Sequence, residues 1–98
     1  MLFAVIIQDK PDCSDIRAKY LQEHIEWLEQ HREVILVGGS LRHEPNWVPK
    51  GGLWIAEAES KSQIEELLKT DPFYAHGLRI SHEIFHWSKA NVDRKVLV

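Results

Sequence analysis

The sequence predicts an α+β domain in which two helices cover one face of a four-stranded antiparallel sheet. Three observations support this prediction: a length of 98 residues, four apolar segments of strand length, and two segments with helical periodicity. One domain usually takes roughly 50 to 250 residues, so residues 1–98 are expected to form a single domain. Since 44% of the residues are hydrophobic and 28% are charged, the composition is that of an ordinary globular protein.

A strand and a helix are expected at the N-terminus. The run Leu2–Ile7 is apolar at every position, which is typical of a central strand covered on both faces. A helix is expected from about Ser14 to His31, with Asp12 or Ser14 as its N-cap. Its apolar and aromatic residues recur at three- and four-residue steps and predict one buried face: Ile16, Tyr20, Leu21, Ile25, Trp27 and Leu28.

Two short strands are expected next. Val34–Val37 is rich in β-branched residues and predicts a second strand that ends in a bulge at Gly38-Gly39. Residues 41–52 contain two prolines and two glycines, which predict a loop. Leu53–Ala56 is expected to form the third strand.

The second helix and the last strand complete the pattern. Ser60 begins a capping-box sequence, and the helix that it starts is expected to end at Thr70-Asp71-Pro72, because the residue before proline disfavours the helical conformation. Leu78–Trp87 alternates as a fourth strand does. Residues 91–98 form a C-terminal tail in which Val96-Leu97-Val98 could add an edge strand.

The resulting order is βαββαβ, which at this length suggests a ferredoxin-like sandwich. Helices then cover only one face of the sheet, although Leu2–Ile7 is apolar on both. The other face is therefore expected to need a partner, most simply an identical subunit, so the sequence predicts a homodimer.

Charge and cysteine content exclude several classes of protein. The net charge is −3 and the two signs are interspersed, which argues against a nucleic-acid-binding surface. The single cysteine, Cys13, cannot form an internal disulfide, so a reducing cytoplasm is expected. Leu2–Ile7 is too short to span a membrane and no basic residues precede it, so neither a membrane anchor nor a signal peptide is expected.

One zinc-type motif occurs in the sequence. His82-Glu83-Ile84-Phe85-His86 matches H-E-x-x-H, whose zinc chemistry requires a helix that brings both histidines to one face. This segment alternates as a strand, in which residues four apart are separated by roughly 13 Å. No metal site is therefore expected, and the pair is interpreted as two surface or interface histidines.

His24 is the most informative histidine, because it falls within the apolar stripe of the first helix. Arg17 lies about two turns earlier and projects from nearly the same side, roughly 10 Å away along the axis, so the two could line one cleft. A histidine in this position is either a hydrogen-bonded core residue or a functional group.

Asp71 is a candidate partner for His24. Pro72 holds its backbone extended at the end of the second helix, and from there its carboxylate could reach the first helix. A carboxylate on one imidazole nitrogen fixes the tautomer and raises the basicity of the other, as in a general base. The alternative is that Asp71 only caps the turn.

Other residues carry weaker signals. Ser40 follows Gly38-Gly39 and could place a hydroxyl near a ligand. Cys13 lies near a helix N-terminus without a neighbouring base, so no role is expected for it. Trp54 and Trp87 are expected to pack in the sheet or an interface rather than stack on nucleic-acid bases.

Several segments together resemble a known family. They are Gln8-Asp9-Lys10-Pro11, Arg17 and His24 followed by Ile25 and Leu28, the Gly38 turn, Gly51-Gly52 before a strand that ends in Glu57-Ala58-Glu59-Ser60, and Asp71-Pro72-Phe73-Tyr74 with Gly77. In order and spacing they resemble the YciI-like (YCII-related) family over nearly the whole chain. The resemblance implies a dimeric α/β barrel of two ferredoxin-like protomers, and a His and Asp pair as the active site of each. Carried over, the pair is His24 and Asp71, with Arg17 and Ser40 as pocket residues.

The sequence thus leads to two hypotheses of function. The first is a small cytoplasmic enzyme without cofactor, of the lyase or isomerase type, in which His24 and Asp71 move a proton on a small anionic substrate held by Arg17. The resemblance associates one branch of the family with loss of halide from a chlorinated aromatic compound. The second is a non-catalytic small-ligand-binding or regulatory domain with the same pocket, because such residues also suit binding of an anion.

Overall fold

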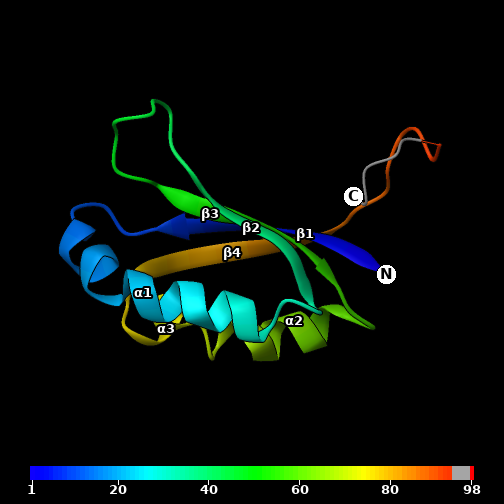
Figure 1. Cartoon of the computed structure of the whole chain (residues 1–98), viewed down its shortest axis with the longest axis horizontal. Helices are drawn as coiled ribbons and strands as arrows, with labels where there is room; N and C mark the ends of the chain where they lie inside the picture. The colour runs from blue at the N-terminus through cyan, green and yellow to red at the C-terminus, as the bar shows by residue number, and fades with distance from the viewer. Residues whose placement is uncertain (94–97) are drawn as a thin grey trace.

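The computed structural model has two layers, a four-stranded sheet and a layer of helices (Figure 1). It describes residues 1–93 and 98. The elements, in chain order, are β1 (Leu2–Asp9), α1 (Ser14–Gln30), β2 (Ile35–Leu41), β3 (Gly51–Glu57), α2 (Lys61–Leu68), α3 (Pro72–Ala75) and β4 (Arg79–His86). No helix in the described part of the chain is long and apolar enough to cross a membrane.

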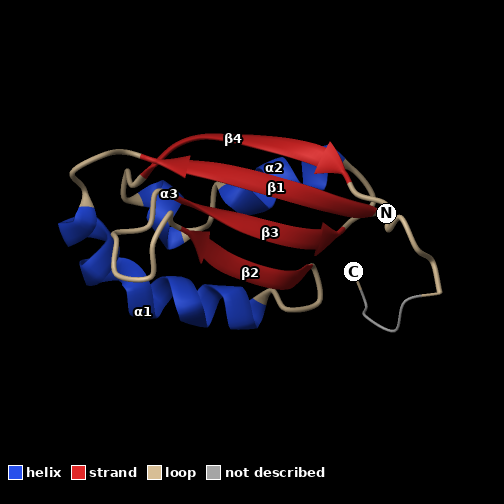
Figure 2. Cartoon of the chain, turned by 90° about the horizontal axis from the view of Figure 1, so that it is seen from above, coloured by secondary structure: helices blue, strands red, loops and turns tan. Residues whose placement is uncertain are grey.

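The sheet has the strand order β2-β3-β1-β4, and every neighbouring pair is antiparallel (Figure 2). This is the ferredoxin-like arrangement, so the predicted fold is confirmed. β1 is a central strand, as its apolar sequence predicted. The short helix α3 was not predicted; it follows directly from Asp71 as N-cap and Pro72 at its first position.

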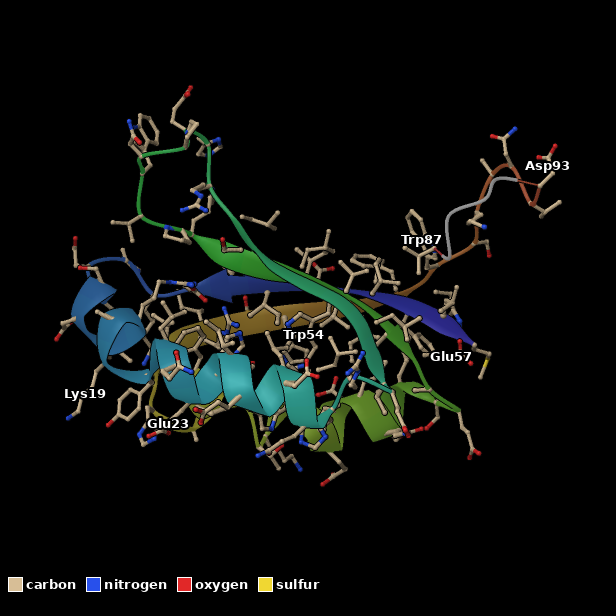
Figure 3. The ribbon with its side chains drawn as sticks, viewed as in Figure 1. Lys19, Glu23, Trp54, Glu57, Trp87 and Asp93 are labelled. Carbon is tan, nitrogen blue, oxygen red and sulfur yellow. The ribbon has the colours of Figure 1, made fainter. Side chains whose placement is uncertain are left out.

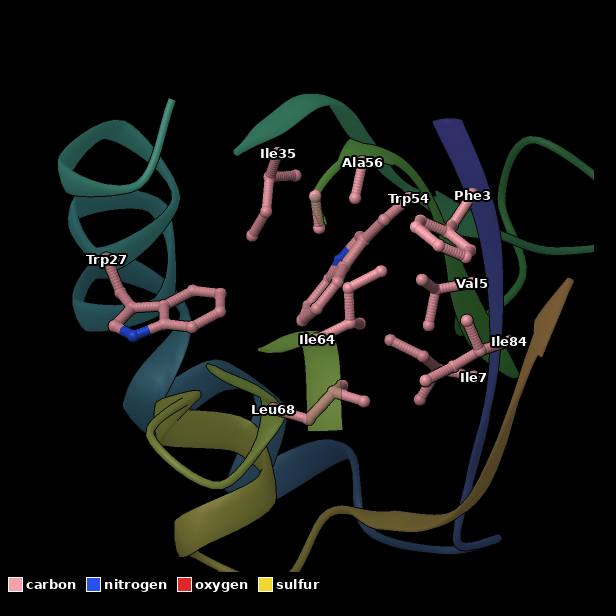
Figure 4. Packing of buried hydrophobic residues seen from close by; sticks show 11 residues of the cluster. Phe3, Val5, Ile7, Trp27, Ile35, Trp54, Ala56, Ile64, Leu68 and Ile84 are labelled. Carbon is pink, nitrogen blue, oxygen red and sulfur yellow. The ribbon is translucent and has the colours of Figure 1, made fainter. Parts of the chain in front are cut away.

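The hydrophobic core lies between the sheet and the helices (Figure 4). Because side chains alternate along a strand, Phe3, Val5 and Ile7 of β1 all point into it. Trp54 of β3 is buried among them, and Trp27 reaches it from α1 with 5.5 Å between the ring centroids. Figure 3 shows Trp54 between the two layers. This core fixes the distance between α1 and the sheet, and the candidate site lies beside it.

The opposite face of the sheet carries no helix (Figure 1). The exposed fraction there is 40% for Ile6 of β1, 47% for Phe85 of β4 and 49% for Val37 of β2. The loop between β2 and β3 rises on this side. The expectation that helices leave one apolar face bare is therefore confirmed.

Two expectations about α1 are wrong. Its N-cap is Cys13, which makes no side-chain cap, rather than Asp12 or Ser14; Asp12 has φ 59°, a left-handed turn conformation, and Ser14 is already helical. The predicted buried face is narrower than expected, because Leu21 and Ile25 are 42% and 48% exposed. Only His24 and Trp27 of α1 are buried, since α1 lies along the β2 edge of the sheet rather than over its middle (Figure 2).

The second helix starts as predicted. The Ser60 hydroxyl accepts a hydrogen bond from the Gln63 N–H at 3.3 Å, and the Gln63 side chain accepts one from the Glu59 N–H at 2.9 Å. This reciprocal pair satisfies two N–H groups where α2 begins.

The second strand was predicted too short. β2 does not end at Gly38-Gly39 but continues through both glycines to Leu41, and its irregularity lies earlier, between Ile35 and Val37. Glycine weakens a strand, yet pairing with β3 continues because Gly39 and Leu41 lie opposite Leu53 and Gly51. Of the expected edge strand Val96-Leu97-Val98, Val96 and Leu97 lie outside the described residues, and Val98 is not in a strand.

Gly51 and Gly39 provide a matched test of this packing. A Cβ at Gly51 would overlap the carbonyl oxygen of Ile7, whereas a Cβ at Gly39 would meet nothing within 4 Å. We expect Gly51→Ala to lower the free energy of unfolding by about 1–3 kcal/mol, because the overlap is with backbone. Gly39→Ala should change it by less than about 1 kcal/mol, in the stabilising direction. Urea unfolding measures both, and equal effects would contradict the register described here.

Candidate active site

His24 and Asp71 lie side by side beneath the sheet. His24 is on α1 and faces the protein interior, and its Nδ1 lies 2.7 Å from Oδ1 of Asp71. Both residues are buried. The Phe73 ring stacks on the imidazole, with 4.2 Å between centroids and 17° between planes. The Phe73 ring therefore supports one face of the imidazole, and Asp71 holds its Nδ1.

The position of Asp71 follows from the turn between α2 and α3. Its backbone is extended (φ −61°, ψ 123°), as expected before Pro72, and its Oδ1 also accepts the N–H of Phe73 at 3.1 Å. Asp71 is thus both a helix cap and a partner of His24, so the two readings of this residue are compatible. Oδ2 accepts a long hydrogen bond of 3.4 Å from Nε of Arg79.

Three groups around Asp71 can donate hydrogen bonds, which suits an ionised carboxylate because it only accepts. Nδ1 of His24 is then the protonated nitrogen. Nε2 makes no hydrogen bond to any described residue. His24 lines a cavity of about 180 Å³, so the unprotonated nitrogen is the one left for a ligand.

Two buried residues that the sequence analysis did not single out extend this contact. Nη1 of Arg79, at the start of β4, donates to Oδ1 of Asp9 at 2.7 Å, and Asp9 also pairs with Arg17 of α1. The guanidinium carbons of Arg17 and Arg79 each lie 5.0 Å from the centroid of the Phe73 ring. The chain of contacts runs from His24 through Asp71, Arg79 and Asp9 to Arg17.

This network is balanced in charge. Two carboxylates, Asp9 and Asp71, face two guanidinium groups, Arg17 and Arg79, so these four buried charges compensate one another. Buried charges without such pairing would be very costly. The arrangement therefore fixes the orientation of Arg17 as well as that of His24.

The cavity combines these polar groups with an apolar wall. Arg17, His24 and Ser40 line it together, so the structure brings the predicted pocket residues to one place. A Cβ at Gly52 would lie 3.1 Å from the carbonyl oxygen of Gly39, whereas its distance of 3.6 Å to Nη1 of Arg79 would be an ordinary contact. The remaining lining residues are Leu21, Ile25, Leu28, Gly38, Gly39, Gly51 and Arg79.

The H-E-x-x-H segment lies in strand β4, as predicted. His82 is bonded to the Tyr74 hydroxyl at 2.6 Å and to a Glu65 oxygen at 2.8 Å. Burial, and next the charge of Glu65, raise the pKa of Tyr74 above its usual value. His86 lies 4.8 Å from the Phe3 ring instead. In the described part of the chain, no group of three or more His, Cys, Asp or Glu side chains is placed to hold a metal ion.

The remaining signals lie outside this cavity. Cys13 lines a second cavity, of about 440 Å³, at the N-terminal end of α1. Trp54 is buried in the core, as expected for a packing role, and Trp87 is partly exposed at the end of the bare sheet face.

Comparison with known proteins identifies the family. The sequence matches the YCII-related domain over residues 1–88. The chain belongs to the YCII-related family. The resemblance noted from the sequence is therefore confirmed, whereas a search of curated proteins found no match.

A solved structure is similar over most of the chain. It is 5-chloro-2-hydroxyhydroquinone dehydrochlorinase (TftG) from Burkholderia phenoliruptrix AC1100, in complex with 2,5-dihydroxybenzoquinone. The two chains are 27% identical, the match covers 90% of this chain and 94% of that one, and the TM-score is 0.80. A member of this fold with detectable sequence similarity is thus a dehydrochlorinase that binds a small ring compound.

Arg79 tests the buried network. In Arg79→Ala, Asp71 loses its guanidinium partner and Asp9 keeps only Arg17. We therefore expect the free energy of unfolding to fall by about 3–5 kcal/mol. Arg79→Lys keeps the charge without the planar fork and should fall between that variant and the wild type. The control is Arg32→Ala, whose exposed pair with Glu29 should be worth less than about 1 kcal/mol. If urea unfolding shows the same loss of free energy of unfolding in Arg79→Ala as in Arg32→Ala, the buried network is contradicted.

Proposed function

We propose that this protein is an enzyme of the lyase type that works without a cofactor. In this proposal His24 moves a proton on a small substrate that carries a hydroxyl group or a negative charge. The observation that carries the proposal is the geometry of His24: Nδ1 is held by Asp71 and Nε2 is left for the cavity. This is the arrangement of a general base whose tautomer is fixed by a carboxylate.

Each polar group of the cavity has a role in this proposal. Nε2 of His24 accepts a proton from a hydroxyl of the substrate, and Asp71 stabilises the imidazolium that forms. Arg17 and the Ser40 hydroxyl bind the oxygens of the substrate, with the guanidinium favouring the anion that the proton leaves behind. Arg17 is already held by Asp9, so it binds without first losing side-chain freedom.

The similarity to the dehydrochlorinase supports loss of hydrogen chloride as the reaction type. In such a step one hydroxyl proton is transferred to the carbon that carries chlorine, the base takes a second hydroxyl proton, and chloride leaves with the electron pair of the carbon–chlorine bond. The substrate loses one proton and one chloride ion in total, so the reaction needs no oxidant or reductant.

His24→Gln tests the chemistry. The enzyme should release chloride from 5-chloro-2-hydroxyhydroquinone, and glutamine, which cannot act as a base, should lower kcat by about 10²- to 10⁴-fold. His24→Ala should do the same. His43→Gln is the matched control, because His43 is exposed in the β2–β3 loop and should keep the wild-type rate. Circular dichroism checks that each variant is folded.

Two outcomes would reject this mechanism. If both His24 variants release chloride at the wild-type rate, the contact of His24 with Asp71 has only a structural role. No turnover, with binding of a small anion that Arg17→Ala weakens and His24→Ala does not, would favour the non-catalytic ligand-binding domain.

We also propose that the protein is a homodimer formed through the bare sheet face. On this face Ile6 and Phe85 lie on the neighbouring strands β1 and β4 and are 40% and 47% exposed, which favours an interaction surface. A second copy is the simplest partner, since two such faces are complementary by symmetry.

Light scattering tests the dimer. At micromolar concentration we expect twice the chain mass of 11.4 kDa, and a shift toward the monomer in Ile6→Glu and Phe85→Glu, because each buries a charge in the interface. Val92→Glu, at a residue that is 86% exposed in the tail, should stay dimeric. A wild-type monomer would contradict the proposal.

The cytoplasm is the proposed location. Cys13 is the single cysteine and is unpaired, which suits a reducing compartment.

A further inference from the structure

We infer that the substrate carries an apolar extension, which lies in the groove between α1 and the edge strand β2. The inference rests on the proposed function, since it names the class of molecule that the same site accepts: a hydroxylated ring with a hydrocarbon chain, rather than a bare ring.

The first observation is the exposure of apolar residues on α1. Leu21 and Ile25 continue the apolar stripe of the helix, yet they are about half exposed. No strand lies over them, because α1 runs along the β2 edge (Figure 2). They instead form the outer wall of the cavity whose inner end holds His24 and Arg17. The cavity is thus polar at its inner end and apolar at its mouth.

The second observation is that this wall continues. A groove of about 580 Å³ runs on from the mouth between α1 and β2, and Ile25, Leu28 and Gly38 line both spaces. Gly38 is the floor where they meet: a Cβ there would lie 3.3 Å from a Leu28 methyl carbon and would narrow the passage. The groove is completed by Glu29, Arg32, Ile35 and Leu36.

The third observation is size. The cavity beside His24 holds about 180 Å³, close to an engineered cavity of about 150 Å³ that binds benzene, whereas pockets for larger ligands span roughly 300–1,000 Å³. One ring therefore fills the inner space. Any further part of the molecule has to leave through the mouth. The groove next to the mouth offers it the apolar side chains of Leu28, Ile35 and Leu36, while Glu29 and Arg32 also line that groove.

A second cavity also adjoins the site, but it is less suited to the extension. The two spaces share only Arg17, whose guanidinium is paired with Asp9. An apolar chain directed there would have to pass this ion pair. Ile80 lines that cavity and not the groove, so it can report on this alternative.

The probes for the test are hydroquinone and its 2-methyl, 2-propyl and 2-pentyl derivatives, with dissociation constants from isothermal titration calorimetry under argon. A completely buried methylene tightens binding by about fourfold, and a half-buried one by about twofold. In the wild type, the pentyl derivative should bind at least about tenfold more tightly than hydroquinone. This ratio, rather than either constant alone, is the quantity compared between variants.

Leu36→Ser, which changes the groove and not the cavity, should lower that ratio by about threefold or more. Leu41→Ser is the control on the same strand, since Leu41 lines neither space, and it should keep the wild-type ratio. Ile80→Ser should also keep it.

Three results would overturn the inference. The first is a wild-type ratio near one, which leaves the proposed reaction intact if chloride release is still observed. The second is a ratio that survives Leu36→Ser and is lost in Ile80→Ser, because the chain then lies in the second cavity. The third is no binding of any of these hydroquinones, which counts against the hydroxylated-ring substrate and the extension together.

Discussion

The structure of the candidate site depends on one carboxylate, that of Asp71. It accepts hydrogen bonds from the imidazole of α1, from the first turn of α3 and from the guanidinium at the start of β4. The helices α1 and α3 and the strand β4 are therefore joined at one buried group, and α1 is the element distant in sequence. Pro72 makes this possible, because it stops the chain from continuing as helix after α2 and fixes the extended backbone that turns the carboxylate inward.

Stability alone does not explain so many buried charges. A buried ion pair is often no better for stability than apolar residues of the same volume, whereas removal of one partner is very costly. The network of Asp9, Arg79 and Asp71 thus gives little net stabilisation and much orientation. It holds Arg17 and His24 at the same cavity before any ligand arrives, which is the preorganisation that the proposed proton transfer requires.

The fold was predictable because strand alternation and helix signals agreed with one another, and the contact of His24 with Asp71 was within reach of the same reasoning. Asp9 was also readable in principle, since it continues the buried alternation of Phe3, Val5 and Ile7. Arg79 was not. Its inward position depends on the register shift between β1 and β4 next to Asp9, and no local pattern specifies a shift that arises from pairing of strands about 70 residues apart.

The failed expectation for α1 has the same kind of cause. Periodicity shows which residues share a face of a helix, but it does not show how much of that face the sheet covers. Here β2 ends the sheet, and the helix projects past it, so Leu21 and Ile25 stay open while His24 and Trp27 are buried. An apolar stripe that the fold itself leaves half covered keeps a hydrophobic driving force for whatever else can cover it. Because that stripe lines the mouth of the His24 cavity, a ligand bound next to His24 is well placed to cover it and to gain this hydrophobic stabilisation.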